Sequence, residues 1–182
     1  MNDLLINNLT LYNRFSQDEL KNINQEEYTE MIKEVTEIKN LEEFIQIYSY
    51  LKKPNSSNNG MEISFFKNGI KPVWENDEHK DGGKVNLKLK KENSNAVWDE
   101  IILHFVTNSF PNVNNDDITG VLFSVKNNFV VVQIWFKYFN SQIANNFTSS
   151  MRSIFSLDET FDFDIRPFNK SSQFSFNKKV NK

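Results

Sequence analysis

A tryptophan and a glutamate stand side by side, at Trp74 and Glu75, in the strongly polar segment KPVWENDEHKDGG. An indole ring in such a segment offers an aromatic face to a flat ligand, or else folds back and caps the core. The neighbouring carboxylate accepts hydrogen bonds from two adjacent N–H groups, which is the donor pattern of a guanine edge. These residue types therefore indicate a nucleotide-binding site.

The segments around this loop predict strands that position it. The run MEISFFKNG, residues 61–69, reads as a strand ending in an Asn-Gly turn. The run KVNLKLK, residues 84–90, alternates strictly, with its apolar residues on one side and its lysines on the other. The second run therefore predicts a half-buried strand with a basic outer stripe next to the loop.

The remaining elements follow from spacing. Asn40 fits the N-cap of a helix, LTLYN at 9–13 fits a first strand, and 31–38 fits a helix or a strand. The apolar run 120–136 predicts a hairpin around Asn127-Asn128. Hairpin-connected strands interspersed with helices predict an α+β fold, an antiparallel sheet with helices on one face. Helical spacing of apolar residues predicts three helices, at about 40–51, 95–107 and 141–155.

The composition restricts the class of protein. The 182 residues predict one domain, and a formal net charge of -3 excludes a broad positive surface for nucleic acid. An anionic partner must therefore meet a local patch. With no cysteine, disulfides, thiolate catalysis and cysteine-based zinc sites are excluded. No apolar run is long enough for a membrane span, so we expect a cytoplasmic protein, with the nucleus as a second location.

Catalysis is the weaker class of function for this sequence. Neither His79 nor His104 has a nucleophile or metal-ligand partner at a recognisable spacing, and a surface or half-buried position is expected for both. The glycines form no phosphate-cradling loop, and no pair of carboxylates stands out as an acid and base. We therefore expect a binding protein without catalytic residues, metal or cofactor.

The stretch FFKNGIKPVWENDEHKDGGKVNLKL resembles the central motif of the eukaryotic translation initiation factor 4E family, which binds the 7-methylguanosine cap of messenger RNA. The similarity continues through VWDEIILHFVTNSF and ITGVLFSVKNNFVVVQIW, and covers about 31–157. The resemblance implies one domain, 1–182, with a curved antiparallel sheet of about eight strands and three helices on its convex face. Three segments match poorly: about 1–8, 16–27 and 170–182.

The resemblance also implies a cap site on the concave side. Tyr28 and Trp74 would sandwich the base, Glu75 would accept its N1 and N2 hydrogens, and Trp135 would touch its N7 methyl group. Methylation makes the base cationic, so each ring adds a cation–π attraction of about 1–2 kcal/mol when desolvated. A tyrosine at position 28 is similar to the 4E-homologous class, which binds the cap more weakly and often represses translation. The alternative is that the Tyr28 side chain only packs.

Two lysines match the phosphate-binding positions of the family, namely Lys126 and Lys84. Val131 stands where the family has a further phosphate-binding lysine, so one charge is missing. The resemblance assigns no such role to the other lysines of this region, which we interpret as solvated charges: Lys88, Lys90 and Lys91.

The family binds a helical peptide, from a 4G-like scaffold or a 4E-binding protein, on the convex side. Ile45 replaces a usual tryptophan there, which weakens a helix-in-groove site. The alternative is that the aliphatic members of this set are inner-face helix residues, and Trp98 is expected to pack with one edge exposed. The matching positions are Leu41, Ile45, Trp98, Glu100 and Leu103.

The sequence fits three functions. The first is a cap-binding initiation factor that recruits a scaffold. The second is a cap-binding repressor, which Tyr28 favours, and the third is a divergent relative that binds proteins alone. None of these functions involves a membrane or DNA.

Overall fold

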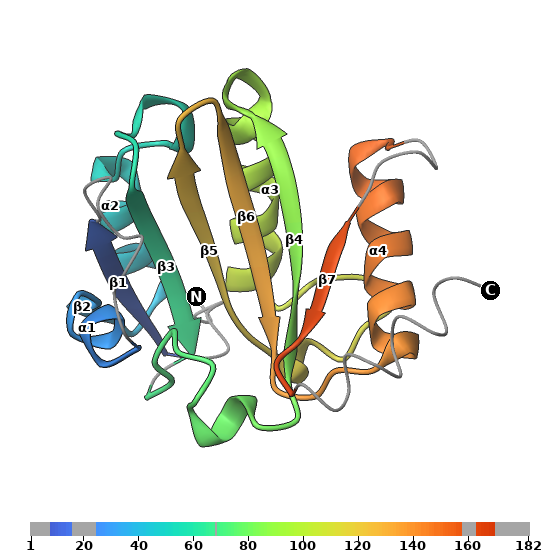
Figure 1. The fold of residues 1–182 in the computed structure, drawn as a ribbon. Coiled ribbons are helices and arrows are strands. Elements are labelled where there is room, and N and C mark those ends of the chain that lie inside the picture. Colours follow the sequence, from blue (N-terminus) through green and yellow to red (C-terminus); the bar gives the residue numbers. More distant parts are fainter. Residues whose placement is uncertain (1–7, 16–24, 68, 158–162, 170–182) are drawn as a thin grey trace.

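The computed structural model describes residues 8–15, 25–67, 69–157 and 163–169 (Figure 1), and the side chains of Gln25, Glu26 and Tyr28 also lie outside the description. The described strands are β1 (Leu9–Phe15), β2 (Lys33–Ile38), β3 (Met61–Lys67), β4 (Gly83–Lys90), β5 (Ile118–Lys126), β6 (Phe129–Phe136) and β7 (Asp164–Pro167). The α-helices are α1 (Gln25–Glu30), α2 (Leu41–Tyr50), α3 (Ser94–Val106) and α4 (Ser141–Phe155).

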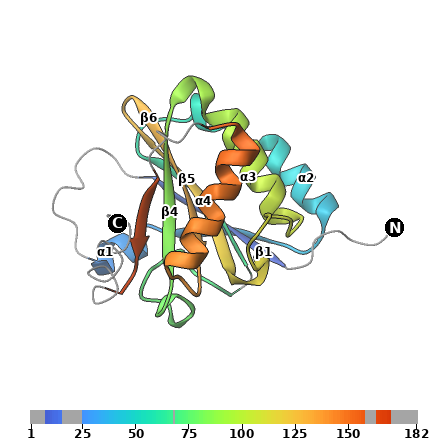
Figure 2. The same cartoon turned by 90° about the vertical axis from the view of Figure 1, so that its right-hand side faces the viewer.

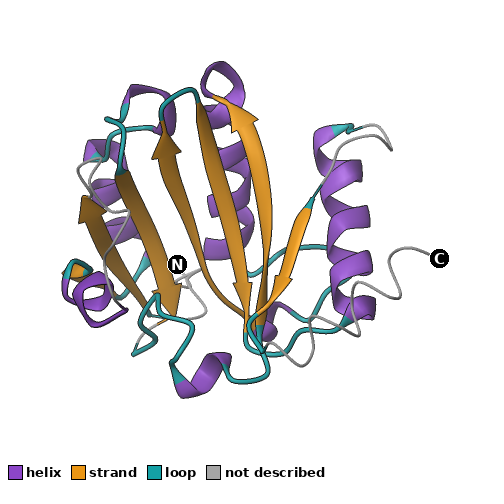
Figure 3. Ribbon diagram, viewed as in Figure 1, coloured by secondary structure: helices purple, strands orange, loops and turns teal. Residues whose placement is uncertain are grey.

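The strands form one sheet in the order β2-β1-β3-β5-β6-β4-β7, and every pair of neighbours is antiparallel (Figure 3). Figure 2 shows α2 and α3 on one side of the curved sheet and α1 on the other. Buried residues of α2, α3 and α4 share one core with the strands. The expected α+β fold is therefore confirmed, with three helices on the convex face and seven described strands in place of about eight.

The convex core follows from the alternation of the strands. Every second residue of β4, namely Val85, Leu87 and Leu89, faces this core and is buried. The partner strand β6 contributes Val132 and Ile134, each fully buried, in register with β4. The sequence alternation thus predicted correctly which side of the sheet the helices cover.

Local signals set the ends of several elements. The Asn40 side chain accepts a hydrogen bond from the Glu43 backbone N–H at 2.9 Å, so the predicted cap of α2 is confirmed. The segment 31–38, which fitted a helix or a strand, forms β2 at its C-terminal part. Asn127 and Asn128 join β5 to β6 without adopting a positive φ, so the hairpin does not need the left-handed conformation that these residues tolerate.

The concave face carries a second, smaller apolar cluster. Tyr12, Phe66, Leu122 and Trp135 pack together there. The Phe66 ring lies directly over Gly120, where an added Cβ would collide with it, so the absence of a side chain lets the ring lie on the sheet. This cluster forms the floor beneath the Trp74 loop.

Candidate functional site

The loop that carries Trp74 is anchored by His79, which ends a short 3-10 helix at Asp77–His79. His79 is 0 % exposed, so the expected surface or half-buried position was wrong for this residue. Its Nδ1 donates a hydrogen bond to the Val73 carbonyl at 2.8 Å, because a carbonyl only accepts. Its Nε2 lies 3.0 Å from the Thr119 hydroxyl on β5. His79 thus fixes the backbone just before Trp74 to the sheet.

Trp74 itself points away from the core. Its side chain is 49 % exposed, so the alternative in which the indole caps the core was wrong. A hollow of about 520 Å³ opens beside it, and Glu75 and Phe168 line this hollow together with His79. Phe168 follows β7, so the hollow lies between the Trp74 loop and the far edge of the sheet. An exposed aromatic ring and a carboxylate therefore share one opening.

Trp135 lies beside this hollow but is largely covered. It is 5 % exposed, and its ring centroid lies 4.7 Å from that of Phe168 and 5.0 Å from that of His79. Its indole Nε1 donates to the Gln133 side-chain oxygen at 3.0 Å. Little of the ring surface therefore reaches solvent, and Phe168 presents an aromatic ring to the hollow in front of it.

Lys84 lies on the strand next to Trp135. Its ammonium donates to the same Gln133 oxygen at 3.2 Å and lies 5.1 Å from the Trp135 ring centroid. Burial lowers the pKa of Lys84 to about 8, against a smaller opposing effect of Glu62. Lys126 is the last residue of β5, at the end of that strand away from Lys84, and it is exposed. The two predicted phosphate ligands thus face the same side of the sheet from opposite ends.

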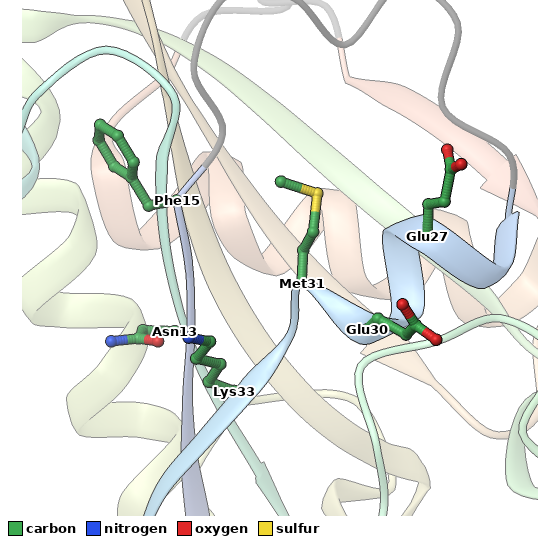
Figure 4. Close-up of a pocket in the computed structure, with 6 residues that line it drawn as sticks. All are labelled: Asn13, Phe15, Glu27, Glu30, Met31 and Lys33. Carbon is green, nitrogen blue, oxygen red and sulfur yellow. The ribbon is translucent and has the colours of Figure 1, made fainter.

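Tyr28 belongs to α1, and its side chain lies outside the described part of the chain, so its stacking role stays a prediction. The same helix borders a second hollow of about 760 Å³, which Glu27, Met31 and Phe15 help to line (Figure 4). Phe15 is 50 % exposed there. This hollow adjoins the helix that carries Tyr28, beyond the end of β1.

The predicted partner residues divide into exposed and buried groups. Ile45 on α2 is 58 % exposed and Leu103 on α3 is 55 % exposed, so the inner-face alternative was wrong for both. Leu41 is partly buried and packs against the core. Trp98 is 1 % exposed, so its expected exposed edge is absent and its ring belongs to the core. The available apolar surface is therefore Ile45 and Leu103.

Polar contacts hold the helices that carry this surface. The Tyr48 hydroxyl of α2 and the Lys53 ammonium both bind the Asp99 carboxylate of α3. The Glu100 carboxylate lies 3.3 Å from His104 Nε2, one turn further along α3. His104 is half-buried, within the range expected for it. The Tyr48–Asp99 contact fixes α2 relative to α3, whereas the Glu100–His104 contact lies within α3.

Sequence reasoning missed His79, Phe168 and Gln133 as parts of the site. His79 stood in the quoted motif, but its contacts with Thr119 depend on a fold that joins residues 40 positions apart. Phe168 lies where the family resemblance is faint. Gln133 lies two positions before Trp135 on β6 and therefore on the same face of the sheet. This spacing is the sequence pattern that could have identified it.

The described residues contain neither a cluster of metal ligands nor a membrane-spanning helix. No group of three or more acidic or histidine side chains among them could hold a metal ion. None of the helices in that part of the chain is long and apolar enough to cross a membrane.

An exposed aromatic ring and a carboxylate at one opening, on the concave side of a helix-backed sheet, define a binding protein of the α+β class. The family model described as eukaryotic initiation factor 4E matches residues 5–182. The chain belongs to this eukaryotic initiation factor 4E family. The resemblance carried by the tryptophan motif is thereby confirmed.

Individual relatives are distant in sequence. The chain is 27% identical over 135 residues to eukaryotic translation initiation factor 4E-4 of Caenorhabditis elegans, which covers 74% of this chain and 63% of that protein. It is 31% identical over 108 residues to initiation factor NCBP of Oryza sativa, covering 59% of this chain and 47% of that protein. The chain thus spans less than two thirds of the length of these curated relatives.

Solved structures share the fold. C. elegans eIF4E-3, in complex with the 4E-binding protein Mextli and a cap analog, has a TM-score of 0.79 and 21% identity, with 93% of this chain and 94% of that chain covered. Ascaris suum eIF4E-3 with m7G cap has a TM-score of 0.76 at 19% identity, over 91% of each chain. At these identities the likeness concerns the fold.

Proposed function

We propose that this protein binds the 7-methylguanosine cap of messenger RNA at the hollow beside Trp74. The observation that carries the proposal is the 49 % exposure of the Trp74 ring at an opening that Glu75 also lines. A methylated base is cationic, so it gains attraction over an electron-rich indole face that neutral guanine lacks. The nematode relatives whose structures contain a cap or cap analog support this ligand.

Each group at the hollow has a proposed role. Glu75 accepts hydrogen bonds from the guanine edge, and Tyr28 provides the second stacking ring from α1. Phe168 adds an apolar wall to the hollow in front of Trp135. Trp135 contacts the methyl group with the small part of its ring that is exposed. Lys84 and Lys126 attract the triphosphate on the concave face. The binding step involves no bond making, so we propose a non-catalytic protein. We also propose that it acts in the cytoplasm.

The test is a titration of intrinsic tryptophan fluorescence with 7-methyl-GTP and, separately, with GTP. We expect saturable quenching by the methylated nucleotide at concentrations where GTP has no effect. Trp74→Ala and Glu75→Gln should each lower the affinity by about tenfold or more, since each removes a charge-assisted contact. Glu78→Gln is the matched control, because this exposed carboxylate belongs to the same loop but is absent from the hollow lining. Equal affinity for both nucleotides would refute the cationic stacking mechanism.

We further propose that the exposed pair Ile45 and Leu103 binds an amphipathic helix of a partner, from a 4G-like scaffold or a 4E-binding protein. Aliphatic side chains 58 % and 55 % exposed on two clamped helices match the anchors of a helix-in-groove interface. The structure of the C. elegans relative with Mextli contains such a binding protein. A partner of this kind serves translation initiation or its repression.

A cell-free translation reaction separates these two outcomes. Adding the protein to capped and uncapped reporter messages should raise capped translation if it recruits a scaffold, and lower it if it acts as a repressor. Ile45→Glu should abolish a rise, because it removes the partner while leaving cap binding intact. A protein that binds proteins alone would show no difference between capped and uncapped messages.

A further inference from the structure

The concave face of β4, β5 and β6 carries four lysines. Alternation places Lys84, Lys88 and Lys90 of β4 on this face, and Lys126 of β5 joins them. The three strands contain no aspartate or glutamate. Among the described residues, none of the four lysines lies within 4.0 Å of a carboxylate. A chain with a net charge of -3 therefore concentrates positive charge here.

The charged groups on either side of these strands are already paired. Arg14 of β1 contacts Glu62 of β3 at 3.0 Å, and both side chains are nearly buried. Arg166 of β7 contacts Asp164 at 2.7 Å on the same strand. The carboxylates of these flanking strands are therefore bound to arginines, and the lysines between them remain available to an external anion.

Two lysines of β4 lie against aromatic rings at opposite ends of the neighbouring strand β6. Lys84 lies against Trp135, and the Lys88 ammonium lies 4.1 Å from the centroid of the Phe129 ring. Trp135 and Phe129 are six positions apart, which is about 20 Å along an extended strand. One phosphate group does not reach both ammonium groups, so an extended chain of phosphates is the anion that matches them.

Phe129 gives the distal end of this face an aromatic surface. It is partly exposed, Lys88 packs over its ring, and Lys126 and Lys90 are its register partners on the two neighbouring strands. A ring surrounded by lysines is the combination that binds single-stranded nucleic acid, since a base stacks on the ring while the cations meet its phosphates. Ser124 and Val131, the next residues of this face along β5 and β6, are register partners of each other.

We propose that the Phe129 end of the concave face is a subsite for the single-stranded RNA that follows the cap, with Phe129 stacking a base and Lys88 binding its phosphates, beyond the triphosphate at Lys84 and Lys126. The proposal rests on the proposed cap site, because the triphosphate held at Lys84 sets the direction of the strand. Lys88 thereby gains a role in place of the solvated charge expected from the sequence. It lies directly opposite Val131, where the family's lysine is missing.

The experiment measures the binding of a short capped oligopyrimidine RNA, labelled at its 3′ end, by fluorescence anisotropy. The affinities for 7-methyl-GTP and for the same RNA with an uncapped 5′ triphosphate are measured for comparison. We expect capped RNA to bind several-fold more tightly than 7-methyl-GTP. Phe129→Ala should weaken RNA binding by about tenfold and leave 7-methyl-GTP binding unchanged. Phe129→Leu, which keeps an apolar side chain, should weaken RNA binding similarly, which separates stacking from folding.

Charge is tested with a second set of variants. Lys88→Ala should lower the slope of log affinity against log salt concentration for capped RNA by about 0.7, which corresponds to one lost phosphate contact. Lys52→Ala, an exposed lysine just after α2, is the control and should change nothing. Capped RNA binding no more tightly than 7-methyl-GTP would overturn the subsite, as would equal competition by an acidic peptide.

The two proposals fail in different ways. If 7-methyl-GTP does not bind, the cap site is refuted. The effect of Phe129→Ala on the affinity for the uncapped RNA then still tests the subsite. If 7-methyl-GTP binds but the RNA and the Phe129 variants show no added effect, the subsite is refuted and the cap site stands.

Discussion

The two faces of the sheet bury different chemistry. The convex face buries Phe65, Val85 and Ile134 at 0 % exposure beneath three helices. The concave face buries Arg14 and Glu62 as an ion pair in addition to its smaller apolar cluster. Burying polar groups costs free energy unless they are paired, whereas burying apolar groups stabilises the fold. Buried groups of both faces should therefore determine stability, whereas the exposed Trp74 and Ile45 should determine binding, so substitutions of the two kinds should have separable effects.

The largest effect on stability is expected on the convex side. Trp98→Ala removes a ring that is 1 % exposed and should lower the free energy of unfolding by about 3–5 kcal/mol. Trp74→Ala, at a ring 49 % exposed, should change it by less than about 0.5 kcal/mol. Urea unfolding of both variants makes the comparison, and similar losses would contradict the division between buried and exposed residues.

A smaller loss is expected from the ion pair of the concave face. Glu62→Ala leaves the Arg14 guanidinium buried without its carboxylate, which should cost about 3 kcal/mol. The double variant Arg14→Met with Glu62→Leu should recover much of this loss, because it removes both charges. A single-variant effect below about 0.5 kcal/mol in urea unfolding would mean that water solvates the pair.

Cap affinity should depend on pH through Lys84. With a pKa of about 8, its ammonium is mostly charged at pH 7 and mostly neutral at pH 9, so phosphate attraction falls as the pH rises. We expect the affinity for 7-methyl-GTP to decrease by up to about tenfold over this range. Lys84→Arg should flatten the profile. A flat profile in the unsubstituted protein would exclude Lys84 as a phosphate ligand.

His79 should make stability depend on pH in the acidic range. Burial lowers its pKa below 6.5, so folding favours the neutral ring. The stabilising contribution is present above the unfolded-state value of 6.5 and is lost as the pH falls toward the folded-state pKa, at up to about 1.4 kcal/mol per pH unit. His79→Gln should remove this component from the difference in urea unfolding between pH 7 and pH 5. An unchanged difference would contradict the assignment.

The smallest effect on stability is expected at Ile45. Ile45→Ala should change the free energy of unfolding by less than about 0.5 kcal/mol, because the side chain is 58 % exposed. Ile47→Ala, two positions along α2, removes a side chain that packs against the core and should cost about 2 kcal/mol. Partner-peptide binding should show the opposite order, and a larger stability loss at Ile45 would mean that it is a core residue.

Most of the fold could be predicted from periodicity. The alternation of β4 and the helical spacing of α3 and α4 depend on neighbours close in sequence, and the Asn40 cap is local as well. The segment that forms β2 could not be assigned, because its apolar spacing fits both periods. Its identity depends on pairing with β1, a contact that sequence spacing does not encode.

The site could be predicted less completely. Trp74 and Glu75 share the predicted opening because they are adjacent in one loop. Burial could not be predicted in the same way: Trp98 and Leu103 occupy the same helix, yet one is 1 % and the other 55 % exposed. Spacing on a helix separates its faces but does not give the width of the stripe that the sheet covers. Phe168 reaches the site through β7, a strand that pairs at the sheet edge.

The contact between Phe66 and Gly120 couples substitutions at two positions that are distant in the sequence. Because a Cβ at position 120 would collide with the ring, alanine there is tolerated once a smaller residue occupies position 66. Losing the ring first leaves a gap that costs packing but causes no clash, whereas losing the glycine first causes the clash. Among related sequences, the loss of this glycine should therefore be found together with the loss of the aromatic ring, and the ring should be the first of the two to change.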